Sequence, residues 1–220
     1  MPDLILFDFD GTLADTAPDL AAAANLQRTA RGLPPLPYEQ LRPVASQGAR
    51  GLLRVALDLR PEDMEYPDVR DQFLKDYAAG MDQQSELFAG VDALLGQIED
   101  AGMRWGIVTN KVAWLAEPLI ASLGLKAAVV VCGDTTPHAK PHPLPLLHAA
   151  RELGTDPARC VYIGDDLRDI QAGKAAGMPT VAAAWGYCGD AEPVTTWQAD
   201  AVADTPLAVW PALQRLASAS

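Results

Sequence analysis

Two carboxylates stand two residues apart near the start of the chain, where Asp8 and Asp10 follow the apolar run 4–7. Because the side chains of a strand alternate between its faces, both carboxylates would leave the backbone on the same side. Their repulsion is tolerable when a cation lies between them, and hard oxygen ligands suit Mg²⁺. Gly11 then allows a tight turn, and Thr12 offers a hydroxyl and an amide to an anion. This string predicts a site for chemistry rather than a solvated strand end.

Three further groups follow other predicted strands, at the strand ends where open α/β sheets place their ligands. Thr109 could bind a phosphate oxygen, although a Thr there is more often a cap. Lys140 is followed by Pro141 and Pro143, which stiffen its approach, whereas a lone Lys is normally solvated. Asp165 is nearest to its strand end and is the better metal candidate, while Asp169 is equally well explained as a helix cap.

The apolar, β-branched runs that would form strands alternate with helical patterns. These runs are 4–9, 105–108, 128–131, 161–163 and 180–184. Glycines that would end the intervening helices are Gly102, Gly124 and Gly177. Strands without polar alternation are covered on both faces, so the chain predicts an α/β fold with a mainly parallel sheet flanked by helices.

A long segment without a strand-like run separates the first predicted strand from the next. It is about ninety residues long, far more than the roughly 10 to 12 that a crossover needs. Thr16–Asp19 reads as a capping box that starts a helix ending at Gly32. Further helical patterns occur at 38–41, 49–57 and 67–79. We therefore predict a helical subdomain over 16–80, inserted into an α/β core of 1–15 and 81–220.

Composition limits the possible partners. The 220 residues are 49% hydrophobic and can bury a core as one large domain or one domain with an insertion. A net charge of −12 argues against nucleic acid or an anionic membrane as partner, and an anionic substrate would need locally placed cations. The sequence has neither a membrane-length apolar run nor a leader pattern, so we expect a cytoplasmic protein. Three widely spaced cysteines, Cys132, Cys160 and Cys188, read as reduced thiols without a role.

Together these pieces resemble the four motifs of the haloacid dehalogenase superfamily of phosphatases. The matching residues are Asp8-Phe9-Asp10-Gly11-Thr12, Thr109 within Val108-Thr109-Asn110, Lys140 before Pro141, and Gly164-Asp165-Asp166 with Asp169. Their order and spacing match, including a helical insertion after the first motif, so the resemblance covers essentially the whole chain. It implies a Rossmann-like sheet with an inserted α-helical cap.

The resemblance implies a role for each motif. Asp8 would be the nucleophile that forms an aspartyl phosphate, and Asp10 would act first as general acid and then as general base. Mg²⁺ would be held by Asp8, the Asp10 backbone carbonyl and Asp165. The phosphate-binding residues would be Gly11, Thr12, Thr109, Asn110 and Lys140. Asp166 and Asp169 would orient Lys140 or metal-bound waters.

Other activities share part of this pattern. Dehalogenases of the superfamily lack the second acid, so Asp10 favours a phosphatase. A sugar phosphomutase keeps all four motifs and the same class of cap, and it remains an alternative. A non-catalytic binding protein on the same scaffold is a further alternative, because fold does not fix function.

The substrate must be chosen mainly by the cap, where Ser46, Gln47, Gly48 and Arg50 are the most substrate-like residues. The alternative is a helix start, with Ser46 as its cap and Arg50 in solvent. The chain resembles bacterial phosphoglycolate phosphatases and is also similar to the N-acetylmuramic acid 6-phosphate phosphatases. Both groups act on small phosphorylated metabolites that carry a carboxylate, which Arg50 could bind.

The strings behind the second resemblance are Ser46-Gln47-Gly48-Ala49-Arg50, Val108-Thr109-Asn110-Lys111 with Ala116-Glu117-Pro118, and Gly164-Asp165-Asp166-Leu167-Arg168-Asp169. The sequence leaves a monomer and a homodimer open. It gives no role to the histidines near the Lys140 motif, which are His138, His142 and His148.

Overall fold

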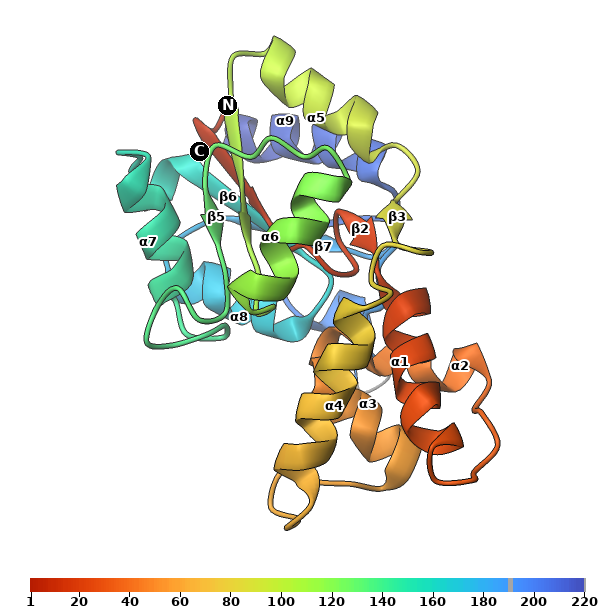
Figure 1. Ribbon diagram of the computed structural model, residues 1–220. Helices are drawn as coiled ribbons and strands as arrows, with labels where there is room; N and C mark the ends of the chain where they lie inside the picture. The colour runs from red at the N-terminus through yellow and green to blue at the C-terminus, as the bar shows by residue number, and fades with distance from the viewer. Residues whose placement is uncertain (190–191, 220) are drawn as a thin grey trace.

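The computed structural model describes residues 1–189 and 192–219, and its centre is a six-stranded parallel sheet (Figure 1). The strand order is β5-β4-β1-β6-β7-β8. The strands are β1 (Leu4–Phe7), β4 (Arg104–Val108), β5 (Val130–Val131), β6 (Cys160–Gly164), β7 (Thr180–Ala183) and β8 (Ala201–Ala203). The predicted α/β fold with a Rossmann-like sheet is confirmed. The strand β8 has no counterpart among the predicted runs.

The central strand β1 sets the position of the residues that follow it. All four of its residues are apolar and buried, as expected for a strand that is covered on both faces. Phe7 pairs in register with Ile107 of β4 on one side and with Ile163 of β6 on the other. The carboxyl ends of these three strands are therefore level, and the residues just after them are neighbours.

Helices cover both faces of the sheet because alternate strand residues point to opposite sides. Ile5 and Phe7 belong to an apolar cluster with α5, α6 and α9, whereas Leu4 and Leu6 belong to a cluster with α7 and α8. The bounds are α5 (Val91–Asp100), α6 (Ala113–Ser122), α7 (Leu144–Glu152), α8 (Leu167–Ala175) and α9 (Val209–Ala219). The layers can be followed in Figure 1.

Four helices early in the chain form a group beside the sheet, at the lower right of Figure 1. They are α1 (Ala17–Thr29), α2 (Tyr38–Leu41), α3 (Gly48–Leu57) and α4 (Tyr66–Ala78), with the 3₁₀ helix η1 (Arg42–Gln47) before α3. They share an apolar cluster whose largest fully buried side chains are Phe73 and Tyr77. The remaining 3₁₀ turns are η2 (Pro157–Arg159), η3 (Val194–Thr196) and η4 (Pro206–Ala208). The division at 16 and 80 stays a prediction.

Two short strands lie in the segment that was expected to contain none. β2 (Ala14–Asp15) pairs antiparallel with β3 (Glu86–Leu87), so the expectation of a strand-free segment was wrong. Strands of two residues are too short to give an alternating pattern in the sequence.

The predicted capping box at the start of α1 was also wrong. The Thr16 side chain makes no capping hydrogen bond, and its hydroxyl donates to Asp10 Oδ1 at 2.5 Å. The Asp19 carboxylate accepts from the backbone N–H groups of Gln84 and Ser85. Thr16 therefore binds the loop just before its helix and Asp19 binds a distant segment of the chain, and neither closes the helix end as predicted.

None of the described helices combines the length and the apolar character that a membrane crossing requires. The three cysteines are free, as expected: Cys132 and Cys160 are buried, and Cys188 is half-buried.

Candidate active site

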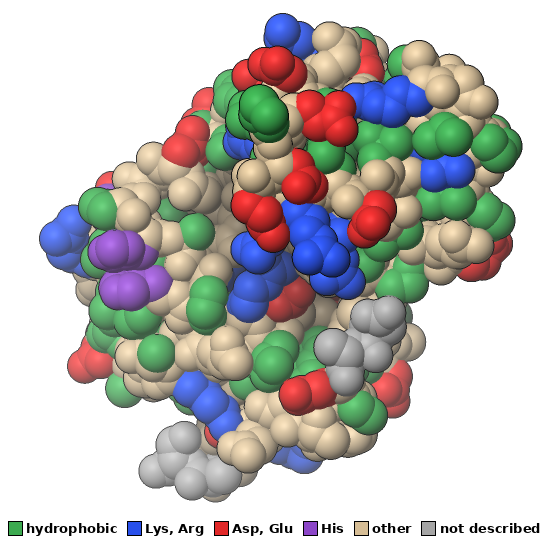
Figure 2. Space-filling view, turned by 90° about the horizontal axis from the view of Figure 1, so that it is seen from below, with side chains coloured by type: hydrophobic (Ala, Val, Ile, Leu, Met, Phe, Trp, Pro, Cys, Tyr) green, Lys and Arg blue, Asp and Glu red, His purple; other side chains and the backbone are tan. Residues whose placement is uncertain are grey.

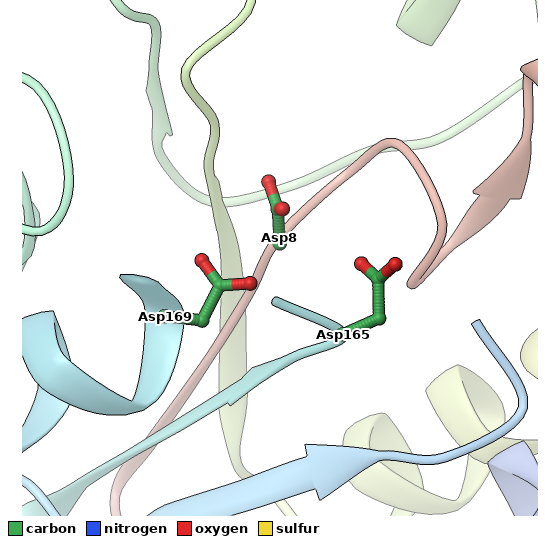
Figure 3. A group of neighbouring side chains, drawn as sticks. All are labelled: Asp8, Asp165 and Asp169. Atoms are coloured by element: carbon green, nitrogen blue, oxygen red, sulfur yellow. The ribbon is translucent and has the colours of Figure 1, made fainter. Parts of the chain in front are cut away.

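Three buried carboxylates meet at the carboxyl ends of the central strands (Figure 3). Asp8 follows β1, Asp165 follows β6, and Asp169 lies in the first turn of α8. One carboxylate oxygen from each lies within 4.8 Å of the others, and the exposed fractions of the three residues are 8%, 0% and 1%. Such a set of hard oxygen atoms fits a divalent cation such as Mg²⁺.

The electrostatics of this group support the fit to a cation. Burial raises the pKa of Asp8 to about 7, although Lys140 opposes the shift. Burial also raises the pKa of Asp165 well above its usual range, with further contributions from the charges of Asp8 and Asp169. Carboxylates crowded together away from water are costly to ionise, and a bound cation removes that cost.

Lys140 is the cation that the protein itself supplies to this group. Its ammonium lies 2.8 Å from Asp8 Oδ1, 2.8 Å from Asp169 Oδ1 and 2.7 Å from the Tyr162 hydroxyl. The Asn110 side chain fixes the Lys140 backbone, because it accepts from the Lys140 N–H at 2.9 Å and donates to the Lys140 carbonyl at 3.0 Å. Asn110, which was predicted to bind phosphate, uses its side-chain amide for these two hydrogen bonds to the backbone of Lys140.

Asp165 is held by three donors from distant parts of the chain. It accepts from the Thr12 hydroxyl at 2.9 Å, from the Tyr187 N–H at 2.9 Å and from the Ser46 hydroxyl at 3.2 Å. Gly11 has φ +84°, and a Cβ there would lie 2.2 Å from Asp165 Oδ2. Gly11 and Thr12, predicted to bind phosphate, therefore both contribute to the position of Asp165.

The carboxylate of Asp10 lies in a separate polar network. Its Oδ1 accepts from Lys111 Nζ at 2.8 Å in addition to the Thr16 hydroxyl. Lys111 Nζ also donates to the Tyr77 hydroxyl of α4 at 2.8 Å. Burial acts to lower the pKa of Lys111, but Asp10 and Tyr77 outweigh it and raise the pKa. The sequence reasoning gave Lys111 no role, although it stands two residues after Thr109 in the same strand-end loop.

Asp166 and Asp169, grouped together in the prediction, occupy different positions. Asp166 caps α8, and both of its carboxylate oxygens accept from the Arg168 guanidinium at 2.8 Å. Asp169 completes a capping box on the Asp166 N–H and also pairs with Lys140. The same Arg168 donates to the Ser46 carbonyl at 2.8 Å, which links α8 to the helical group.

A cavity of about 270 Å³ lies between the strand ends and the helical group. Five cations and four carboxylates line it, so a chain with a net charge of −12 presents an interior that does not repel an anion. The polar lining residues from the core are Asp8, Asp10, Thr109, Asn110, Lys111, Lys140, Asp166, Arg168 and Asp169. Thr109 Oγ1 accepts from the Lys111 N–H at 3.1 Å.

The four predicted substrate-contacting residues of the helical group all line this cavity. They are Ser46, Gln47, Gly48 and Arg50. The alternative in which Ser46 caps a helix is wrong, because Gln47 stands at the N-cap of α3 and the Ser46 hydroxyl reaches Asp165. Arg50 is exposed.

A second groove of about 670 Å³ adjoins the cavity and shares Gln47, Arg50, Asp166 and Arg168 with it. Arg54 and Arg60 extend the positive lining of this groove. Lys and Arg side chains gather in the middle of the face seen in Figure 2, with acidic side chains beside them.

The chain is similar to known proteins over most of its length. Residues 5–183 match the family described as haloacid dehalogenase-like hydrolase. A phosphoglycolate phosphatase from Xanthomonas campestris is 48% identical, over 95% of both chains. An N-acetylmuramic acid 6-phosphate phosphatase from Pseudomonas aeruginosa is 43% identical, over 92% of this chain and 90% of the other. The crystal structure of a predicted phosphoglycolate phosphatase from Haemophilus somnus superposes with a TM-score of 0.85 at 26% identity, covering 96% of this chain and 97% of the other.

Proposed function

Because the chain belongs to the haloacid dehalogenase-like hydrolase family and is a phosphatase, we propose that it hydrolyses small phosphomonoesters that carry a carboxylate, through a phosphorylated aspartate. The family and the enzyme class predicted from the motifs are thus confirmed, whereas the substrate and the mechanism are proposals. The observation that carries the proposal is Asp8, a cavity-lining carboxylate fixed by Lys140 beside two further buried acids.

Asp8 is the nucleophile of the proposed reaction. One of its carboxylate oxygens attacks the phosphorus, a bond forms between them, and the bond from phosphorus to the ester oxygen breaks. Lys140, whose charge faces Asp8 at 2.8 Å, offsets the negative charge that gathers on the transferring oxygens. The Thr109 hydroxyl lines the same cavity and can donate to one of those oxygens.

Asp10 carries the proton in both halves of the reaction. In its protonated form it donates to the leaving ester oxygen, which departs as an alcohol. It then accepts a proton from the water that attacks the phosphorus, and the bond to Asp8 breaks to release inorganic phosphate, which restores the Asp8 carboxylate and the protonated form of Asp10. Thr16 and Lys111 hold its Oδ1, which fixes the side chain at the cavity wall.

We assign the cation to Asp8, Asp165 and the Asp10 backbone carbonyl, with the Asp169 carboxylate within reach of the same position. Bound Mg²⁺ would offset the charges of the phosphate and of Asp8, so that two anions can approach each other. Asp165 is suited to hold it because Thr12, Tyr187 and Ser46 fix its carboxylate.

The first substrate that we propose is 2-phosphoglycolate, because the relative at 48% identity is named for it. The second candidate is N-acetylmuramic acid 6-phosphate, named in the relative at 43% identity and favoured by the arginine-lined groove that continues outward from the cavity. In both cases we assign the helical group α1–α4 the role of a cap, because its residues line the same cavity as Asp8 and Asp10.

The test is release of inorganic phosphate from both compounds, with Mg²⁺ present and after its removal by a chelator. We expect turnover that Mg²⁺ restores, that Asp8→Asn abolishes, and that Asp100→Asn at the exposed end of α5 leaves unchanged. Acid-stable trapping of ³²P on the wild type but not on Asp8→Asn would support the covalent step. Normal turnover by Asp8→Asn would refute the assignment of the nucleophile.

A further inference from the structure

We propose that Lys111 binds the carboxylate of the substrate and selects esters in which that carboxylate sits on the carbon bearing the phosphate. The inference rests on the proposed phosphatase reaction and names the substrate class more closely. It assigns the selecting contact to a residue of the catalytic core, whereas the sequence pointed to Arg50 in the helical group.

The surroundings of Lys111 parallel those of Lys140. Lys140 binds two carboxylates and a tyrosine hydroxyl, so each of its three N–H groups has an acceptor. Lys111 binds one carboxylate, Asp10, and one tyrosine hydroxyl, Tyr77. Its third N–H has no acceptor among the described residues. A substrate carboxylate would complete for Lys111 the set of partners that the chain supplies to Lys140.

Lys111 is also a firmly placed cation rather than a surface lysine. Its side chain is only 7% exposed, and its ammonium lies 4.5 Å from the centre of the Tyr77 ring. It lines the same cavity as Asp8 and Asp10. A buried ammonium with a spare donor makes a strong hydrogen bond to a carboxylate, because few water molecules compete for it.

The position of Asp10 limits how far the substrate carboxylate can lie from Lys111. In the proposed reaction Asp10 protonates the ester oxygen, so the two groups are within hydrogen-bond reach. In 2-phosphoglycolate a single methylene separates that oxygen from the carboxylate. Since Lys111 Nζ is 2.8 Å from Asp10 Oδ1, its spare N–H is close enough to reach this carboxylate.

Arg50 and Arg54 are placed for a substrate whose carboxylate lies far from its phosphate. In N-acetylmuramic acid 6-phosphate the carboxylate lies across the sugar ring from the phosphate, too far from the ester oxygen to share its neighbours. Such a carboxylate would extend toward Arg50 and Arg54, which line the outer groove. The chain thus has a near and a far cation site, and the contacts of Lys111 favour the near one.

The experiment compares three compounds on the full-length enzyme with Mg²⁺: 2-phosphoglycolate, 3-phosphooxypropanoate and ethyl phosphate. For the wild type we expect kcat/KM to fall at least tenfold from the first compound to the second, in which one more methylene moves the carboxylate away. We expect Lys111→Met to lower kcat/KM for 2-phosphoglycolate roughly 10- to 100-fold more than for ethyl phosphate, which has no carboxylate. This extra loss should appear mainly in KM.

Two variants separate recognition from support of Asp10. Tyr77→Phe removes a bond of Lys111 but keeps its charge, so its effect should be small and the same for all three compounds. Lys126→Met removes an exposed cation that lines neither the cavity nor the outer groove, and it should leave 2-phosphoglycolate turnover unchanged. Calorimetric binding of 2-phosphoglycolate to Asp8→Asn, with and without Lys111→Met, provides a readout that needs no turnover.

Equal losses for 2-phosphoglycolate and ethyl phosphate in Lys111→Met would overturn the proposal, since they indicate support of Asp10 alone. A wild type that hydrolyses N-acetylmuramic acid 6-phosphate but not 2-phosphoglycolate would also overturn it, while leaving the phosphatase reaction intact. Even if Lys111→Met does not fold, a wild type that hydrolyses 2-phosphoglycolate and 3-phosphooxypropanoate equally well would overturn the proposed selectivity. Hydrolysis of none of these compounds would refute the proposed function itself.

Discussion

Replacing Tyr162 by Phe tests how the buried ammonium of Lys140 is held. The Tyr162 side chain lies in the middle of β6 and is fully buried. Its hydroxyl accepts from Lys140 Nζ at 2.7 Å and donates to the Val108 carbonyl at 2.8 Å. Burial and the charge of Asp169 raise its pKa well above the usual range, so the hydroxyl is a neutral donor at any working pH.

The magnitude follows from the two partners that Tyr162→Phe leaves behind. A buried group without a hydrogen bond costs about 1 to 3 kcal/mol, and charged groups are at the upper end of this range. Lys140 keeps both of its carboxylates, so we expect a total loss of about 2 to 4 kcal/mol in the free energy of unfolding. For a chain of 220 residues this lowers Tm by roughly 5 to 15 °C.

Calorimetry and urea unfolding of Tyr162→Phe and the wild type measure this loss. The matched control is Tyr66→Phe, because the buried Tyr66 has no hydrogen bond from its hydroxyl to any residue that the structure describes. We expect the control to stay within about 0.5 kcal/mol of the wild type. If both variants lost the same stability, or neither did, the hydroxyl of Tyr162 would not hold Lys140 as described.

Two further outcomes follow from close contacts and buried thiols. Gly186→Ala would place a Cβ 2.3 Å from the Asp165 Cβ and 2.4 Å from the Gly11 carbonyl oxygen, so we expect a lower Tm and a smaller increase of Tm on adding Mg²⁺. The control is Gly96→Ala, which has open space around it and should not lower Tm. Equal Tm values for the two variants would contradict the close approach at Gly186. Burial raises the pKa of Cys132 and of Cys160 to about 11, so at pH 7.5 both are neutral thiols and should react with iodoacetamide far more slowly in the folded enzyme than in urea, as mass spectrometry would detect. Fast labelling of the folded protein would argue against their burial.

The acidic residues at the strand ends could be predicted from the sequence because each lies next to the apolar run that forms its strand. Asp8 directly follows an apolar run, and Asp165 follows another, so a short window contains both the strand and the group that it positions. Parallel pairing then brings the groups together, because β1 lies between β4 and β6. The fold class depended on the same runs and was predicted for the same reason.

The partners of these groups could not be found in this way because they depend on contacts far apart in the chain. Tyr162 looks like any other core residue of a strand, and only the assembled sheet brings its hydroxyl to Lys140. Lys111 reaches Asp10 and Tyr77, neither of which is near it in sequence.

Helix boundaries were a second source of error. The helix expected to start near Asp169 begins at Leu167, so Asp166 became the cap. Asp169 is left free to pair with Lys140 as well as to complete the capping box. A shift of two residues in one boundary thus moves the capping position from Asp169 to Asp166, and boundaries are the least certain feature of any sequence pattern.

The short ribbon of β2 and β3 gives the helical group an unusual relation to the sheet. Ala14 pairs with Leu87 and Asp15 with Glu86, so the chain leaves the core and returns to it at adjacent points. Seen from the core, everything between these strands is the loop of a β-hairpin, although that loop contains four helices and an apolar cluster of its own. A loop whose ends are already paired can change in length and sequence without altering the sheet. The helical group, to which we assign the role of a cap, can therefore vary while Asp8 and Asp165 stay at the strand ends of the sheet.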